Sequence, residues 1–216
     1  MVLYPGTEKE ARISAETMQN IVTGIFQRCG MDFSDASQLA DTLIDADLCG
    51  IHSHGVMRVP NYVKRMTHQG VDPRGKPSIV KDSGSVFVID AGNNMGQISG
   101  TFAMRNTIER ARTTGVAVAA VGGSNHCGAM YYYAQMAIEE DMIGVATTNA
   151  LPTMAPWGGS ERILGMNPIA VAIPAGEETP FILDTAFATS SFGKITVLGQ
   201  KGVSLPEGWG IDKEGN

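Results

Sequence analysis

Short apolar runs alternate with helix-like segments through the middle of the chain, and this alternation constrains the fold more than any other feature. The runs SVFVIDA, GVAVAAVGG and MIGVATTNA have the length and composition of strands. The segments between them, 100–111 and 129–140, have the composition of helices. Two later runs, NPIAVAIPA and PFILDTA, predict further strands. Because a β-α-β-α-β order is typical of a sheet with crossover helices, the pattern predicts an α/β protein.

The first part of the chain differs, because helix signals replace strand signals there. Apolar residues recur at helical spacing over 13–29 and again over 34–49. A third segment contains Pro60, which must kink the helix or start a new one. We therefore expect a helical N-terminal region over residues 1–75, followed by an α/β domain over residues 76–216.

Composition excludes several classes of partner. The 22 acidic and 16 basic residues give a net charge of −6, and no block of lysine or arginine interrupts it, which disfavours nucleic acid. The three cysteines lack the spacing of a zinc or redox motif, which suits a reducing cytoplasm. No signal peptide is recognisable, and no apolar run approaches the roughly 18 residues of a membrane span. We expect a cytoplasmic protein without a membrane partner.

The glycine-rich loop GGSNHCG, at 122–128, lies between an expected strand and an expected helix. Such a loop could hold a phosphate, but its glycine spacing matches neither a dinucleotide fingerprint nor a P-loop. His126 is the more informative residue, because a helix N-terminus disfavours a protonated imidazole. A neutral imidazole can accept a proton from an alcohol. The alternative is a histidine that fixes the turn by bonding to the backbone.

Three residues of the third helical segment are spaced to share one helix face. His54, Arg58 and Tyr62 stand at positions i, i+4 and i+8. The planar fork of Arg58 matches a carboxylate, and His54 or His126 could then meet the adjacent oxygen of an α-hydroxy or α-keto acid. In the alternative interpretation Arg58 pairs with an acidic residue and His54 caps a helix.

A metal site is another possible role for the histidines and for the cysteines near them. Suitable ligand atoms are present, but their spacing matches no zinc signature, so we expect no metal. The residues concerned are Cys49, His52, His54, His126 and Cys127.

Several motifs occur together and in a fixed order. ADLCGIHSHGVMRVPNYVKRM is followed by AGNNMGQISG, GGSNHCGAMYYYAQMA, LGMNPIAVAIPA and ILDTAFATSSFGK, and the chain ends in LPEGWGIDKEGN. In this combination the chain resembles the malate/L-lactate dehydrogenase family of the second type over nearly all of its length. That family includes ureidoglycolate and sulfolactate dehydrogenases and diketogulonate reductases.

The resemblance implies a cytoplasmic oxidoreductase that uses NAD or NADP, acts on a small 2-hydroxy or 2-keto acid, and forms a homodimer. It implies a mixed-sheet, non-classical NAD(P)-binding domain preceded by the helical N-terminal region. The family's Ser-His-Gly motif corresponds to residues 53–55, and Arg58 and Tyr62 correspond to substrate-binding residues. In different members either histidine transfers the proton, so His54 and His126 are both catalytic candidates.

The resemblance also implies cofactor-binding residues in two places. One is Asn149, which follows the expected strand in MIGVATTNA, and the other is the segment that starts at Asp184. Family members continue beyond Asn216 with a segment that completes the cofactor site, so we expect the α/β domain to be incomplete at its C-terminal end. Met166 stands where members commonly have threonine. The candidate cofactor-binding residues are Asn149, Asp184, Thr185, Ala186 and Ser190.

Two alternatives to a 2-hydroxy-acid dehydrogenase stay open. The same fold could reduce a cyclic imine or a diketo sugar acid. A shortened chain could instead be catalytically impaired and retain only a role in oligomerisation.

Overall fold

The computed structural model describes residues 11–212, and it begins with two helices that pack against each other. Helix α1 covers Ala15–Arg28 and α2 covers Phe33–Leu48, where the apolar spacing predicts them. Ser14 caps α1 and Asp32 caps α2, each through a side-chain oxygen that accepts a backbone N–H. Helix α2 therefore begins before Ser34, the residue from which the sequence pattern starts it.

The third helical segment is divided into three pieces. Two 3-10 turns, η2 and η3, cover His52–His54 and Val56–Arg58, and helix α3 covers Val59–Thr67. Pro60 lies in the first turn of α3, where its missing N–H removes no helical hydrogen bond. Pro60 thus starts a new helix, and the single helical face expected over this segment is not formed.

The first sheet has three strands and one crossover helix. Strands β1 (Ser78–Asp82) and β2 (Val86–Asp90) are antiparallel, whereas β2 and β3 (Val118–Gly122) are parallel. Helix α4 (Gly96–Thr114) connects the two parallel strands and packs on β3. The predicted crossover is confirmed for this unit. Gly115, with a φ of 78°, ends α4 in the left-handed conformation that glycine tolerates best.

The second sheet is antiparallel and consists of β4 (Gly144–Thr147), β7 (Ile169–Ile173) and β8 (Phe181–Thr185), in the order β4-β7-β8. The run MIGVATTNA therefore forms a strand as predicted, but β4 does not join the sheet of β3. The expectation of one continuous crossover sheet is wrong at this point, because β4 finds its partner in the later strand β7. A small two-stranded sheet is formed by β5 (Pro152–Met154) and β6 (Leu164–Gly165).

Short helical segments connect and follow these strands. The helix expected over 129–140 is divided into α5 (Tyr131–Ala134) and the 3-10 helix η4 (Gln135–Glu140). Helix α6 (Phe192–Gln200) follows β8 and was not predicted from the sequence. Among the described residues, no helix combines the length and the apolar character needed to cross a membrane.

Two main hydrophobic cores hold the chain together. The first lies between α1, α2 and α3 and also takes in Met95 and Ile98 at the start of α4. The second lies between the second sheet and α5, where Tyr131 packs with Ala170 and Ala172 of β7. The N-terminal helices therefore share their core with the crossover helix. The division of the chain at residue 75 stays a prediction.

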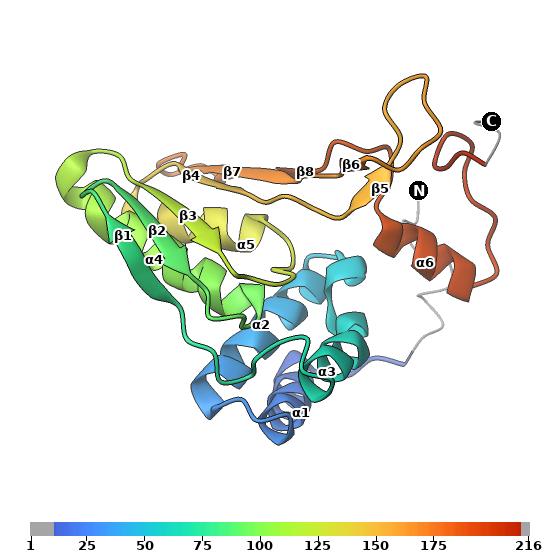
Figure 1. Cartoon of the computed structure of the whole chain (residues 1–216), viewed down its shortest axis with the longest axis horizontal. Coiled ribbons are helices and arrows are strands. Elements are labelled where there is room, and N and C mark those ends of the chain that lie inside the picture. The colour runs from blue at the N-terminus through green and yellow to red at the C-terminus, as the bar shows by residue number, and fades with distance from the viewer. Residues whose placement is uncertain (1–10, 213–216) are drawn as a thin grey trace.

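The face of the second sheet that points away from α5 is uncovered (Figure 1). The strand register aligns Val145 of β4, Val171 of β7 and Leu183 of β8 in one row. Val145 is 54% exposed and Leu183 is 41% exposed. On the opposite face Ala170 and Ala172 are fully buried. The sheet thus buries small side chains against α5 and exposes large apolar ones on its other side.

Candidate functional site

Two histidines from distant parts of the chain meet at the junction of the helices and the first sheet. His54 lies in η2, and His126 lies in the loop after β3. Their rings are stacked, with centroids 5.7 Å apart and planes 21° apart. The structure therefore brings together the two residues that the sequence offers as proton carriers.

Tyr62 of α3 lies directly against His126. Its hydroxyl is 2.7 Å from His126 Nδ1, and the amide of Gln97 donates to the same hydroxyl over 3.0 Å. Tyr62 is only 1% exposed, so its contacts are with Gln97 and His126 rather than with solvent. Its expected role as a substrate-binding residue stays a prediction.

Arg58 lies beside the histidine pair. Its Nε donates to the backbone oxygen of Ser53 over 2.6 Å, which leaves the guanidinium Nη groups for other partners. Within residues 11–212, no carboxylate forms an ion pair with Arg58. The alternative in which an acidic residue engages Arg58 is therefore not observed in the described part of the chain.

Helix α6 closes over this arginine. A Cβ added to Gly193 would lie 2.8 Å from Ser53 Cβ and 2.9 Å from Arg58 Nη2. Only a residue without a side chain allows the first turn of α6 to approach so closely. The neighbouring Lys194 adds a second positive charge near His54. Arg58 and Lys194 thus place two positive charges near His54.

Both imidazoles are neutral at pH 7. Burial, followed by the charges of Arg58 and Lys194, lowers the pKa of His54 from 6.5 to about 4. Burial, followed by Arg58, His54 and Arg65, lowers the pKa of His126 to about 3. From the sequence, we attributed the neutral form of His126 to the dipole at a helix N-terminus. The physical cause is instead burial and nearby positive charge, since α5 begins only at Tyr131.

The Ser-His-Gly turn is held by a carboxylate. Asp47 of α2 accepts the backbone N–H of Val56 over 2.8 Å and pairs with His52 Nδ1 over 2.8 Å. A Cβ at Gly55 would overlap the Asp47 carboxylate. The glycine of the motif thus admits Asp47, which fixes the turn that carries His54. Ser53 Oγ lies 3.0 Å from His54 Nδ1, and neither η3 nor α3 has a side-chain cap, so the alternative in which His54 caps a helix is not observed.

The loop that carries His126 is fixed by its neighbour Asn125. Arg65 donates to Asn125 Oδ1 over 2.7 Å, and Asn125 Nδ2 donates to the backbone oxygens of Asn93 and Asn94. A Cβ at Gly96 would meet the backbone of this loop, at 2.7 Å from the Cα of Cys127. The loop therefore packs directly on the start of α4.

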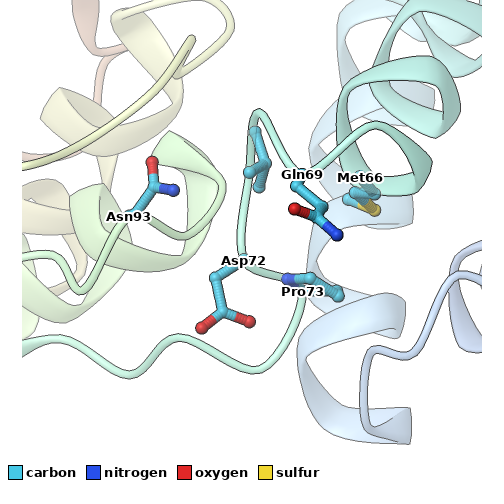
Figure 2. Close-up of a pocket in the computed structure, with 6 residues that line it drawn as sticks. Met66, Gln69, Asp72, Pro73 and Asn93 are labelled. Carbon is cyan, nitrogen blue, oxygen red and sulfur yellow. The ribbon is translucent and has the colours of Figure 1, made fainter.

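A separate cavity of about 190 Å³ lies between the end of α3, the segment that follows it and Asn93 (Figure 2). Asp72 donates its backbone N–H to the backbone oxygen of Asn93 over 2.9 Å across one side of it. Neither histidine lines this cavity, nor does Arg58, so the cavity is distinct from the site formed by His54, His126 and Arg58. Its lining residues are Met66, Gln69, Val71, Asp72, Pro73 and Asn93.

Candidate cofactor residues lie at or beyond the matching ends of two strands of the second sheet. Strands β4 and β8 are both antiparallel to β7, so they run in the same direction, and Thr147 and Thr185 align on Ile169. Asn149, just beyond β4, is exposed, and Ala186 and Ser190 follow β8. Ser190 Oγ is buried without a hydrogen-bond partner among the described residues. This orphaned hydroxyl, in the segment between β8 and α6, fits a bound polar ligand.

Asp184 lies on the same strand but has another contact. Its carboxylate accepts the backbone N–H of Tyr131 over 2.9 Å, at the start of α5. Desolvation of the carboxylate raises the pKa of Asp184, although the residue as a whole remains accessible. Asp184 therefore ties β8 to the segment that follows His126, and its expected contact with a cofactor stays a prediction.

No group of three or more metal-binding side chains is present in residues 11–212. The alternative metal ligands are divided among other contacts, as His52 bonds to Asp47 and His126 to Tyr62.

Sequence reasoning missed several residues of this site. Gln97 lies in the quoted motif AGNNMGQISG, but nothing in that motif indicates that its amide turns inward to Tyr62. Gly193 and Lys194 lie in the quoted segment ATSSFGK, and only the fold brings α6 to η2. The glycine in that segment was the one available signal for a close approach.

Comparison with known proteins identifies the family to which this α/β fold belongs. The family described as malate/L-lactate dehydrogenase matches residues 13–216. The chain therefore belongs to the malate/L-lactate dehydrogenase family.

Individual members of the family are similar to nearly the whole chain. Malate dehydrogenase from Pyrococcus horikoshii is 40% identical over 97% of this chain and 58% of its own length. Ureidoglycolate dehydrogenase (NAD(+)) from Escherichia coli O157:H7 is 30% identical over 94% of this chain and 58% of its own length. The structure of sulfolactate dehydrogenase from Methanocaldococcus jannaschii superposes with a TM-score of 0.87 at 39% identity, over 94% of this chain and 59% of that one. The chain thus spans about three fifths of the length of these relatives.

Proposed function

We propose that this protein is an NAD(P)-dependent oxidoreductase that transfers a hydride between nicotinamide and carbon 2 of a small 2-hydroxy or 2-keto acid of the malate, lactate, ureidoglycolate or sulfolactate type. The observation that carries the proposal is a pair of neutral, stacked histidines beside Arg58. The names of the relatives support the same class of substrate.

Arg58 binds the substrate carboxylate in this proposal. Its guanidinium lies next to both histidines, and a charge-assisted pair with a carboxylate is strong in a partly buried site. Lys194 adds to the positive potential. A substrate held by its carboxylate presents the oxygen on carbon 2 to the adjacent imidazoles.

The two histidines then take different roles. His126 Nδ1 accepts the backbone N–H of Gly128 over 3.2 Å, so the neutral ring carries its proton on Nε2. We assign to this N–H the hydrogen bond that holds the substrate oxygen. His54 can donate from Nδ1 to Ser53 Oγ, which leaves Nε2 free to accept the hydroxyl proton. In the oxidation, that proton passes to His54 while the hydride leaves carbon 2; reduction reverses both transfers.

The nicotinamide cofactor, NAD or NADP, supplies the hydride chemistry when bound. We assign its contacts to Asn149, which follows β4, and to Thr185, Ala186 and Ser190, which end or follow β8, a strand that runs in the same direction. The buried, partnerless hydroxyl of Ser190 supports a ligand there. The carboxylate of Asp184 positions β8 against α5.

We further propose that the protein acts in the cytoplasm as a homodimer. The three cysteines are free thiols, which fits a reducing compartment. The uncovered apolar face of the second sheet is a surface that a protein partner could cover. Light scattering of the purified chain measures the oligomeric state directly, and a monomer at all concentrations would remove the dimer from the proposal.

The decisive experiment follows absorbance of reduced nicotinamide with malate, lactate, ureidoglycolate and sulfolactate, and with the matching keto acids. Turnover of at least one pair is expected with NAD(H) or NADP(H). If no acyclic acid is turned over but a cyclic imine acid or a diketo sugar acid is reduced, the protein is instead a reductase of that alternative class. Silence with all of them, from a chain that still forms a stable oligomer, would favour the non-catalytic alternative.

Arg58→Ala tests the carboxylate contact. Loss of a charge-assisted hydrogen bond should raise KM about 10- to 100-fold, corresponding to about 1.5–3 kcal/mol. Arg58→Lys keeps the charge but loses the planar fork, so it should recover only part of the affinity. Arg28→Ala, at the exposed end of α1, is the matched control. An unchanged KM in Arg58→Ala would remove Arg58 from the substrate site.

A further inference from the structure

A buried glutamine lies behind the histidine pair and has no role in the proposed function. Gln97, in the first turn of α4, is fully buried. Its Nε2 donates to the hydroxyl oxygen of Tyr62 over 3.0 Å, and that hydroxyl lies 2.7 Å from His126 Nδ1. Gln97, Tyr62 and His126 therefore form a continuous chain of hydrogen bonds that starts in the core and ends in the site.

The direction of this chain is fixed at its far end. The backbone N–H of Gly128 can only donate, and it points at His126 Nδ1 over 3.2 Å. Nδ1 is therefore an acceptor, and the hydroxyl of Tyr62 also donates to it, so the two donors share its single lone pair. The Tyr62 oxygen then needs a donor of its own, which the Gln97 amide supplies. One consistent direction runs through all three contacts.

Burial makes the direction important. Tyr62 is 1% exposed and Gln97 is fully buried, so water does not compete for these groups. Gln97 Oε1 has no hydrogen-bond partner among the described residues, although it is buried. Leaving a buried carbonyl unpaired is unfavourable. The hydrogen bond from Gln97 Nε2 to the Tyr62 hydroxyl gives a reason why the amide is held in this orientation.

We propose that Gln97 is a positioning residue that reinforces the His126 tautomer favoured by the Gly128 N–H: by donating to Tyr62 it directs the tyrosine proton to His126 Nδ1 and helps to keep the histidine proton on Nε2. The Nε2–H is then presented to the substrate oxygen. The catalytic consequence rests on the proposed function, whereas the tautomer itself is a property of the chain without substrate.

Nuclear magnetic resonance of the purified chain with ¹⁵N-labelled histidine tests the tautomer without any turnover. The protein has four histidines, and the His126→Gln variant assigns the resonance of His126. The expected result is an unprotonated Nδ1 and a protonated Nε2 at pH 7. A protonated Nδ1 in the unaltered chain overturns the proposal, whether or not the protein is an active dehydrogenase.

Two substitutions of Gln97 distinguish direction from packing. Gln97→Glu keeps the shape, but an ionised carboxylate accepts and so draws the Tyr62 proton away from His126. Gln97→Met removes the amide but leaves that proton free to reach His126. We expect a reduced Nε2–H population and a kcat about tenfold lower in Gln97→Glu, against less than about threefold in Gln97→Met. A packing role predicts the opposite order, because methionine changes the shape more.

Gln38→Glu provides the matched control. Gln38 donates its Nε2 to the backbone oxygen of Gln97 over 3.0 Å, so it lies in the same contact between α2 and α4 but does not touch Tyr62. This variant should leave the His126 tautomer unchanged. If Gln97→Glu and Gln97→Met both retain the wild-type His126 resonances, Gln97 does not reinforce the tautomer and the proposal is overturned.

Discussion

The two halves of the candidate site are built differently. On the helical side, α1 to α4 enclose a buried core, and the histidines stand on turns held by Asp47 and Asn125. On the sheet side, β4, β7 and β8 bury one face against α5 and leave large apolar residues uncovered on the other. The proton-transfer groups are thus pre-organised by well-packed elements, whereas the proposed cofactor-binding residues lie at or beyond strand ends of a half-covered sheet. The chain spans about three fifths of the length of these relatives.

The largest expected effect lies in the helical core. Leu39 of α2 is fully buried among α1 and α3 residues. Leu39→Ala should lower the free energy of unfolding by about 2–5 kcal/mol, because it leaves a cavity that the helices cannot fill. Urea denaturation followed by circular dichroism measures the change. A loss below about 1 kcal/mol would contradict the tightly packed helical side.

The contact between α4 and the His126 loop should be almost as sensitive. Gly96→Ala places a methyl group against the backbone of Asn125 and Cys127, which cannot retreat without breaking the hydrogen bonds of Asn125. We expect a loss of about 1–3 kcal/mol together with displaced His126 resonances.

Gly24→Ala is the control for this substitution. Gly24 lies in α1, and a Cβ there meets nothing within 4 Å. This variant should gain about 0.5–1 kcal/mol, since alanine favours a helix more than glycine does. Equal effects of the two substitutions would show that the loop is not closely packed on α4.

The partly buried histidines make the helical side sensitive to acid. In the unfolded chain their pKa returns to about 6.5, whereas the folded values are about 4 for His54 and about 3 for His126. Below pH 6.5 the unfolded state therefore binds more protons, so stability is full above this pH and falls as the pH decreases toward the folded values. Each histidine contributes up to about 1.4 kcal/mol per pH unit in that window. Denaturation series between pH 7 and pH 4.5 should show a shallower slope in His126→Gln than in the unaltered chain, and equal slopes would contradict its burial as a neutral group.

The smallest effect is expected on the uncovered sheet face. Leu183, on β8, is 41% exposed, in contrast to the fully buried Leu39. Leu183→Ala should change the stability of this chain by about 0.5 kcal/mol or less. The same denaturation experiment compares it with Leu39→Ala. A loss comparable to that of Leu39→Ala would mean that a partner covers this face in solution.

Local features of the fold could be predicted from the sequence, because they depend on neighbouring residues. The strand runs around Phe87 and Ala170 and the first two helices carry strong periodic signals, and Pro60 does start a helix. Which sheet β4 joins could not be predicted, since its partner β7 is recruited from more than 20 residues further along the chain. Pairing between distant strands is decided by packing rather than by the strand's own residues.

The candidate site divides in the same way. Residue types indicated His54, Arg58 and His126, because a neutral imidazole can accept a proton and a guanidinium fork matches a carboxylate. The stacking of the two rings, the inward amide of Gln97 and the approach of Gly193 to Arg58 depend on contacts between separate elements. The cause of the low pKa of His126 was also misassigned, because burial cannot be read from a loop sequence.

The most direct test of a pre-organised, neutral histidine pair is a pH titration of His54 and His126 by nuclear magnetic resonance. The His54→Gln and His126→Gln variants assign the two sets of signals. Burial and the nearby cations predict that both rings remain neutral down to pH 5, with midpoints at about 4 for His54 and about 3 for His126. A midpoint near 6.5 for either ring, the value of an exposed histidine, would contradict the arrangement on which the proposed proton transfer depends.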